Sequence, residues 1–111
     1  LLTVEADAFI NDAVQIMTQY DISQIPVTRN NEIVGSLNDS HVYTQLLANA
    51  DLKQEKVEKL MQKSFPFVEM QSSIEEVSKK ITKENNAVLV KDLAGKVHII
   101  TKHDIIDAIS N

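Results

Sequence analysis

Hydrophobic positions follow one pattern twice along this chain, at an offset of 62 to 64 residues. In each copy, an extended start leads to an apolar stripe at helical spacing, then to two strand-like runs and a second apolar stripe. The first copy runs through Val4, Ile10, Ala13, Val14, Met17, residues 22–28 and 32–37, Val42, Leu46 and Leu47. The second copy runs through Val68, Ile74, Val77, Ile81, residues 86–90 and 97–100, Ile105, Ile106 and Ile109. The repeat predicts an α/β (α+β) fold of two strand–helix–strand–strand–helix halves related by a pseudo-twofold axis.

Polar residues mark where the predicted elements begin and turn. We expect the first helix to start at Asp7 or an adjacent residue, and Asn38 to cap the second helix. Ser73, with an acidic residue three positions later, is typical of a capping box at the first helix of the second half. Hairpin turns are expected at residues 30–31 and 92–95, where Asn, Asp and Gly gather.

The repeat also sets the expected domain boundaries. One integrated module is predicted, with a first motif at residues 1–48, a connector at 49–62 and a second motif at 63–111. Val57, Leu60 and Met61 give the connector the pattern of a short helix. The sequence opens on Leu1 rather than Met and already has the pattern of a strand, so we expect a fragment of a longer protein.

Composition narrows the functional classes. The net charge of −5, without a basic stripe, argues against nucleic acid or an anionic membrane surface as partner. No apolar run approaches the length of a membrane span, and no signal-peptide pattern opens the chain. The absence of cysteine excludes disulfides and thiolate chemistry and suits a cytoplasmic protein.

The candidate chemistry lies in Thr101, Lys102, His103 and Asp104, which follow a β-branched strand and open a helix. The start of a helix offers unpaired N–H groups and a partial positive charge to an anion, and Lys102 and His103 could meet phosphate. A carboxylate at the third helical position can accept hydrogen bonds from two neighbouring ribose hydroxyls. The same Thr-x-x-Asp pattern is also an ordinary capping box, worth about 1 kcal/mol and needing no ligand. On this motif alone, both interpretations stay open.

The repeat, the Pro26–Val27 pair in the second strand and the closing Gly-x-x-Thr-x-x-Asp-like turns resemble the tandem CBS-domain pair, or Bateman module. The resemblance covers essentially the whole chain. Residues 21–27, 35–38 and 57–61 are similar to the C-terminal regulatory pair of bacterial cystathionine β-synthases. The resemblance implies a regulatory module that binds AMP, ATP or S-adenosylmethionine between its motifs. It also implies a pyridoxal-phosphate-dependent catalytic domain N-terminal to Leu1.

Carried onto this sequence, the resemblance implies two sites of unequal quality. The better-preserved site would use Thr3, Ile22, Ser23, Gln24, Ile25, Ile99, Thr101 and Asp104. The second would use Asn38, His41, Asn86 and Ala87. His41 stands where the ribose-binding acid belongs and cannot offer two carboxylate oxygens, so we expect the second site to be weak or empty. His98 stands where the family often has Gly, which would narrow the first site.

No catalytic or metal-binding constellation accompanies these residues. His41, His98 and His103 are spread over separate elements without ligand spacing, and the sequence holds no nucleophile or dinucleotide motif. We therefore expect a regulatory fragment and not an enzyme. The alternative is a structural dimerisation module that has lost nucleotide binding. The final helix of each half carries more apolar surface than a thin module buries, which predicts a homodimer through the module helices.

Overall fold

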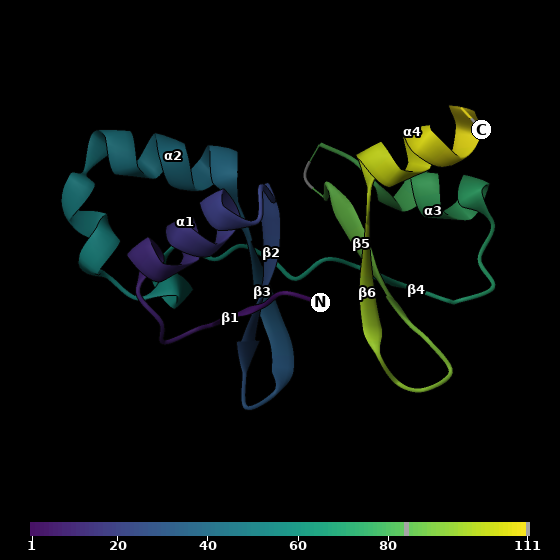
Figure 1. Cartoon of the computed structure of the whole chain (residues 1–111), viewed down its shortest axis with the longest axis horizontal. Helices are drawn as coiled ribbons and strands as arrows, with labels where there is room; N and C mark the ends of the chain where they lie inside the picture. Colours follow the sequence, from purple (N-terminus) through teal and green to yellow (C-terminus); the bar gives the residue numbers. More distant parts are fainter. Residues whose placement is uncertain (84, 111) are drawn as a thin grey trace. The chain divides into compact units, whose positions relative to one another are not determined.

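A computed structural model describes residues 1–83 and 85–110. The chain divides into two compact units, one spanning Leu2–Ser64 and the other beginning at Phe65 (Figure 1). Each unit contains a three-stranded sheet and two α-helices in the order strand, helix, strand, strand, helix. The predicted mixed α+β fold with repeated element order is therefore confirmed.

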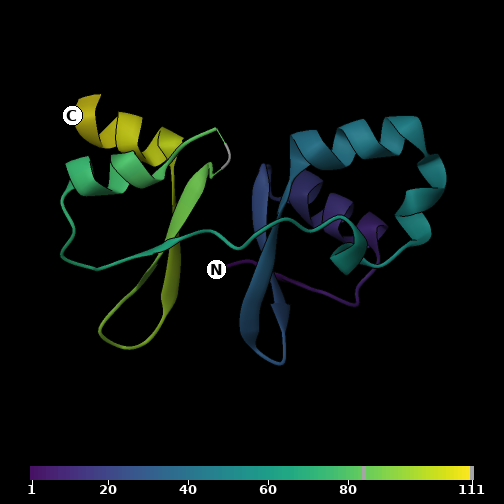
Figure 2. The ribbon, with the colours of Figure 1, turned by 180° about the vertical axis from the view of Figure 1, so that it is seen from behind.

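In the first unit, strand β1 (Val4–Glu5) pairs in parallel with β2 (Gln24–Arg29), which pairs antiparallel with β3 (Glu32–Asn38). Helix α1 (Ile10–Gln19) connects β1 to β2, and α2 (Asp39–Ala48) follows β3. Both helices lie on the same face of the sheet, as the two opposite views show (Figures 1 and 2). The parallel strands β1 and β2 require a crossover connection, and helix α1 provides it.

Asn30 and Asn31 form the tight turn between β2 and β3, as predicted. Their φ angles of 53° and 65° are the paired positive values of a type I′ turn. Asparagine tolerates this left-handed conformation better than other non-glycine residues. The hairpin therefore forms without the usual glycine.

Helix α1 begins at Ile10, three residues later than the predicted start at Asp7. Residues 6–8 instead form a turn in which the Ala8 N–H donates to the Glu5 carbonyl, at 3.1 Å. Phe9 is the cap residue, and its N–H donates to the Asp12 carboxylate at 3.2 Å. The Ile10 N–H donates to the Glu55 carbonyl at 2.9 Å. A local cap and a partner distant in sequence thus fix the start of the helix together.

The core of the first unit lies between the sheet and its two helices. Its members are Val4, Ala6, Ile10, Ala13, Met17, Ile25, Val27, Leu37, Val42, Val57 and Leu60. The helical stripe of α1 is thus confirmed, with Val14 partly buried beside it. In α2, Val42 is buried and Leu46 is half-buried, but Leu47 is 70% exposed, so its own unit covers only part of the apolar stripe. Of the three stripe residues of α2, Leu47 lies farthest around the helix from the buried Val42.

The connector packs on the first unit as two short 3₁₀ helices, η1 (Ala50–Gln54) and η2 (Val57–Lys59), where the sequence predicted one short helix. Val57 is fully buried, and its N–H donates to the Ala8 carbonyl at 2.8 Å. Further along, Gln62 exchanges two backbone hydrogen bonds with Ser36 of β3, at 2.8 and 3.0 Å. The connector therefore covers the outer edge of β3.

In the second unit, β4 (Phe67–Val68) pairs in parallel with β5 (Ala87–Lys91), which pairs antiparallel with β6 (Val97–Thr101). Helices α3 (Ile74–Lys80) and α4 (Lys102–Ser110) lie side by side against this sheet (Figures 1 and 2). The sheet order β4-β5-β6 repeats the β1-β2-β3 order of the first unit.

The predicted cap and turn of the second unit are both present. The Ser73 hydroxyl accepts the Glu76 N–H at 3.1 Å, so α3 starts where the capping pattern predicted. In the hairpin, Asp92 Oδ1 accepts N–H groups from Ala94 and Lys96, both at 2.9 Å. Gly95, with a φ of 84°, provides the left-handed residue that closes the turn.

The core of the second unit is smaller than that of the first. Its buried hydrophobic residues are Phe65, Val77, Ala87, Val88 and Leu89. Ile105 is half-buried, whereas Ile106 and Ile109 are 50% and 70% exposed. The apolar stripe of α4 thus exceeds what its own unit buries.

Candidate functional site

Each unit turns from its last strand into its last helix through a capped corner. In the first unit, Asn38 ends β3, and its side-chain oxygen accepts the backbone N–H groups of Ser40 (2.9 Å) and His41 (3.2 Å). This confirms Asn38 as the cap of α2. His41 is the third residue of that helix and is half-buried. An imidazole therefore occupies the helical position that the carboxylate of Asp104 occupies in the second unit.

In the second unit, Thr101 and Asp104 form a reciprocal capping box at the start of α4. Asp104 Oδ2 accepts the Thr101 N–H at 2.8 Å and its hydroxyl at 3.1 Å, and the Asp104 N–H points back to Thr101 Oγ1 at 3.4 Å. The Thr-x-x-Asp motif therefore forms the capping box that the sequence allowed. This capping box does not occupy both oxygens of the Asp104 carboxylate.

The capping box leaves a defined part of Asp104 available for recognition. Oδ2 already accepts two hydrogen bonds, which is the capacity of a carboxylate oxygen. Oδ1 keeps two lone-pair directions on an exposed side chain. Within the same turn, Lys102 and His103 are exposed, and His103 lies 3.6 Å from Asp107 one turn later. The corner thus combines an oriented carboxylate oxygen with a nearby cation.

The segment before β2 lies against the corner of its own unit. The Asp39 N–H donates to the Ser23 carbonyl at 2.9 Å, and Gln24 pairs with Asn38 across the sheet. Ile22 and Gln24 are half-buried and Ser23 is exposed, whereas the Ile25 side chain is fully buried in the core. Ile25 can therefore meet a ligand only through its backbone.

Gln24 has an unusual environment for an amide side chain. Its Oε1 atom is buried, and in residues 1–83 and 85–110 it has no hydrogen-bond partner. A buried acceptor without a partner costs roughly 1–3 kcal/mol, so such atoms usually meet water or a bound group. Gln24, one of the predicted site residues, thus holds an unused acceptor.

The corresponding segment of the second unit adjoins the Thr101–Asp104 corner. Ala87 pairs with Thr101 at the end of the sheet, and Ile99 pairs with Leu89. Ala87 is fully buried and Asn86 and Ile99 are half-buried.

Thr3, also half-buried, precedes β1 at the start of the first unit. Within each unit, the structure therefore brings together the segment before the hairpin and the corner of that same half. The predicted combination of residues from both halves in one site stays a prediction.

His98, which was expected to narrow the better site, contacts the hairpin of its own unit. Its Nε2 atom lies 2.9 Å from Asp92 Oδ2. This hydrogen bond, followed by the backbone N–H of Lys96, lowers the pKa of Asp92 below its usual range. His98 thus stabilises the hairpin turn between β5 and β6, which lies at the opposite end of β6 from Thr101.

The Asp92 carboxylate predicts a contribution to stability that is lost in acid. Because its pKa is lower in the folded state, its contribution is complete above the unfolded pKa, near 4, and fades as the pH falls through the folded value. The difference in free energy of unfolding between wild type and Asp92→Asn, measured by urea denaturation, should therefore be larger at pH 6 than at about pH 2. In a His98→Ala background, this difference at pH 6 should be smaller. Equal gaps at both pH values would contradict the assignment.

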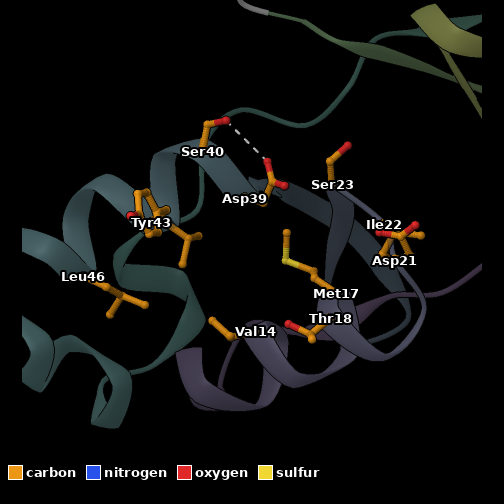
Figure 3. Close-up of a pocket in the computed structure, with 11 residues that line it drawn as sticks. Val14, Met17, Thr18, Asp21, Ile22, Ser23, Asp39, Ser40, Tyr43 and Leu46 are labelled. Carbon is orange, nitrogen blue, oxygen red and sulfur yellow. Dashed lines mark hydrogen bonds between the residues drawn. The ribbon is translucent and has the colours of Figure 1, made fainter.

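The sequence did not predict a groove of about 740 Å³ between α1 and α2 of the first unit. Met17 and Val14 from α1 face Tyr43 and Leu46 from α2 across it (Figure 3). Its polar lining comes from Thr18, Asp21, Ser23, Asp39 and Ser40. The available signal was the apolar stripe of α2, which extends beyond what the core buries.

The second unit has a smaller groove of about 390 Å³ between α3 and α4. It is lined by Ser78, Ile81, Thr82, Lys83, Asn86, Lys102, Ile105 and Ile106.

Among the described residues, no group of three or more His, Cys, Asp or Glu side chains could hold a metal ion. In that same part of the chain, each helix is too short or too polar to cross a membrane.

Comparison with known proteins assigns the family. The CBS-domain family model matches residues 1–48 and 57–111, and the chain therefore belongs to the CBS-domain family, as a tandem pair. A search of curated proteins found no match.

Solved structures share the fold over nearly the whole chain. A CBS-domain-containing protein from Agrobacterium tumefaciens is 20% identical with a TM-score of 0.86, covering 98% of this chain and 89% of that one. CBSX2, a CBS-pair protein of Arabidopsis thaliana solved in complex with AMP, is 21% identical with a TM-score of 0.77 over 99% and 87%. Staphylococcus aureus OpuCA is 26% identical with a TM-score of 0.70 over 98% and 91%. None of these three names a cystathionine β-synthase, so that finer assignment stays a prediction.

Proposed function

We propose that this CBS pair is a regulatory module that binds an adenosine-containing ligand, with Asp104 holding the ribose. The observation that carries the proposal is the capping box, which orients the carboxylate through Oδ2 and leaves Oδ1 for a ligand. An oriented acceptor binds a diol without first losing side-chain freedom. The AMP complex of CBSX2 supports the ligand class.

The other residues of the proposed site supply shape and polarity. Thr101 fixes the carboxylate, and Lys102 beside it offers a charge to a phosphate. Ile22, Ser23, Gln24 and the backbone of Ile25 are proposed to frame the adenine, with Thr3 and Ile99 at its margin. The buried Oε1 of Gln24 suits the exocyclic amine of adenine, which donates hydrogen bonds.

The second site, at Asn38, His41, Asn86 and Ala87, is proposed to bind weakly or not at all. Asn38 already uses its side-chain oxygen to accept two N–H groups of α2. His41 can make one or two hydrogen bonds but has no second carboxylate oxygen. We therefore expect one ligand per chain.

The ligand is proposed to be AMP, ATP or S-adenosylmethionine, and the module is proposed to pass its occupancy to a larger enzyme. Residues 21–27, 35–38 and 57–61 favour a pyridoxal-phosphate-dependent cystathionine β-synthase as that enzyme. In this proposal the module regulates the enzyme and takes no part in catalysis. Purification of the full-length protein with bound pyridoxal phosphate would support a cystathionine β-synthase as the parent enzyme. A catalytic domain of another class would rule that parent out.

A binding series tests the ligand. Titration calorimetry and thermal melts with AMP, ATP, S-adenosylmethionine and S-adenosylhomocysteine should identify one preferred compound. At 100 times its Kd, a ligand adds about 2.7 kcal/mol, which should raise Tm by roughly 10 °C in a domain of this size.

Asp104→Asn is expected to weaken that binding by about 10- to 100-fold, because a charged acceptor is replaced by an amide donor. The amide oxygen of Asn can still accept the Thr101 N–H, so the cap should survive and Tm without ligand should change little. Asp107→Asn removes the same charge from the same helix and should leave binding unchanged. If no compound binds wild type, the module would be a structural dimerisation element.

A further inference from the structure

The groove between α1 and α2 lies within the first unit alone. All of its lining residues fall between Val14 and Leu46, so the groove can be described without the second unit. Its volume of about 740 Å³ falls in the range of about 300–1,000 Å³ that is typical of small-molecule sites. The proposed adenosine site shares only Ile22 and Ser23 with this lining. The groove is therefore a separate candidate site.

Acidic and apolar side chains occupy opposite ends of the groove (Figure 3). The Asp39 N–H donates to the Ser23 carbonyl at 2.9 Å, which holds the start of α2 beside the segment that follows α1. Asp21 and Asp39 therefore lie at the same end. Tyr43 and Leu46 lie about one and two turns further along α2, at the other end. The groove thus changes from polar to apolar along its length.

The charge of the groove lining is negative. In the described residues 1–83, no lysine or arginine lines the groove, and neither α1 nor α2 contains one. Asp21 and Asp39 are both exposed, and the last turn of α1 beside them carries the negative end of the helix dipole. These groups attract a cation and repel a phosphate or a carboxylate.

The start of α2 does not offset this negative charge. A helix start ordinarily offers unpaired N–H groups to an anion. In α2 these groups are occupied, because the Ser40 and His41 N–H groups donate to the Asn38 side chain at 2.9 and 3.2 Å. The Asp39 N–H is held by the Ser23 carbonyl. The acidic end therefore selects a cationic group.

The apolar end fits the body of an organic molecule. Val14 and Leu46 are half-buried and Met17 is buried, so together they form an apolar floor. The Tyr43 ring is 65% exposed at the edge of the groove, where it can pack against an aromatic or aliphatic group. A small inorganic cation would leave this apolar surface uncovered.

We propose that the α1–α2 groove binds an amphipathic organic cation, an amine with an aromatic or aliphatic body. The ammonium group meets Asp21 and Asp39, and the apolar body lies against Tyr43 and Leu46. Such a site gives the module a second ligand input, located in the first unit. This input does not rest on the proposed adenosine function.

Methionine methyl NMR on the full chain tests the proposal, with phenylbutylamine as the probe. Of the three methionines, Met17 lines the groove, Met61 lies in the connector and Met70 lies in the second unit. Titration should move the Met17 resonance saturably and leave those of Met61 and Met70 unchanged. Equal movement of all three resonances, or no saturable movement of Met17, would overturn the proposal.

Related compounds separate the charge from the apolar body. Phenylbutyrate has the same body with a carboxylate, and it should bind about tenfold more weakly or worse because it is repelled. Butylamine keeps the charge but lacks the ring, and it should also lose about tenfold because it covers little of the apolar end. The preference for amine over carboxylate should shrink at high ionic strength. A carboxylate that binds as well as the amine would contradict the assigned charge.

Asp21→Asn and Asp39→Asn should each raise the Kd of phenylbutylamine by about two- to fivefold, through the loss of an exposed ion pair. Asparagine keeps the side-chain acceptor at position 39 and tolerates the left-handed φ of 51° at position 21, so both variants should fold. Circular dichroism checks this.

Asp51→Asn is the matched control, since it makes the same change on an exposed residue of η1 that does not line the groove. It should bind the amine like wild type. If the two groove variants bind as tightly as this control, the carboxylates are not part of the site and the proposal fails. Neither result bears on the adenosine site, whose test scores nucleotide binding and its loss in Asp104→Asn.

Discussion

Leu89→Ala is expected to lower the free energy of unfolding by about 2–5 kcal/mol. Leu89 is fully buried in β5, the middle strand of the second sheet, where it pairs with Phe67 on one side and Ile99 on the other. Truncation removes the transfer free energy of the side chain and leaves a cavity between two paired neighbours that cannot easily close. Few other buried residues share this small core, so little of the loss can be compensated.

Leu93→Ala provides the matched control for that measurement. Leu93 is 96% exposed in the hairpin that follows β5, and the substitution is chemically the same. It should change stability by no more than about 0.5 kcal/mol in urea or guanidinium denaturation. Equal losses for the two variants would mean that Leu89 is not a core residue.

Local signals account for most of the fold that the sequence predicted. Adjacent asparagines at residues 30–31 suffice to define a hairpin, and the side chains of Asn38 and Ser73 define helix starts within three residues of themselves. The start of α1 was misplaced because one of its determinants is distant in sequence. The Glu55 carbonyl holds the Ile10 N–H across 45 residues of sequence. Hydrophobic periodicity has no access to such a contact.

The sequence predicted the apolar stripe of α2 but not which of its residues are covered, for a related reason. Val42 is buried, whereas Leu47 is largely exposed. Periodicity reports which face of a helix is apolar, but how much of that face is covered depends on the width of the sheet beneath it.

The candidate site was also only partly accessible from sequence. Thr101 and Asp104 could be a cap or a ligand site, and the structure shows that the cap occupies Oδ2 only. The two roles are therefore compatible. Gly35, in the first closing turn, is a contact that the sequence did not reveal: the connector comes close to its backbone. A strong prediction follows from this contact.

Gly35→Ala is expected to destabilise the protein by about 2–4 kcal/mol. A Cβ atom at Gly35 would lie 2.8 Å from Met61 Sδ and 2.9 Å from the Gln62 carbonyl oxygen. The thioether can move aside, but the carbonyl accepts the Ser36 N–H at 3.0 Å, and the Ser36 hydroxyl also holds the Lys63 carbonyl at 2.6 Å. The connector cannot retreat without breaking these bonds to the edge of β3.

Two further variants separate the backbone clash from other causes. In Gly35→Ala with Met61→Ala, the side-chain clash is removed but the carbonyl clash stays, so stability should not return to that of Met61→Ala alone. His98→Ala alters the position equivalent to Gly35 in the second half, where the native side chain already points to Asp92. It should cost less stability than Gly35→Ala, because it removes only an exposed ion pair. A fully rescued double variant would show that Met61, and not the connector backbone, requires glycine at this position.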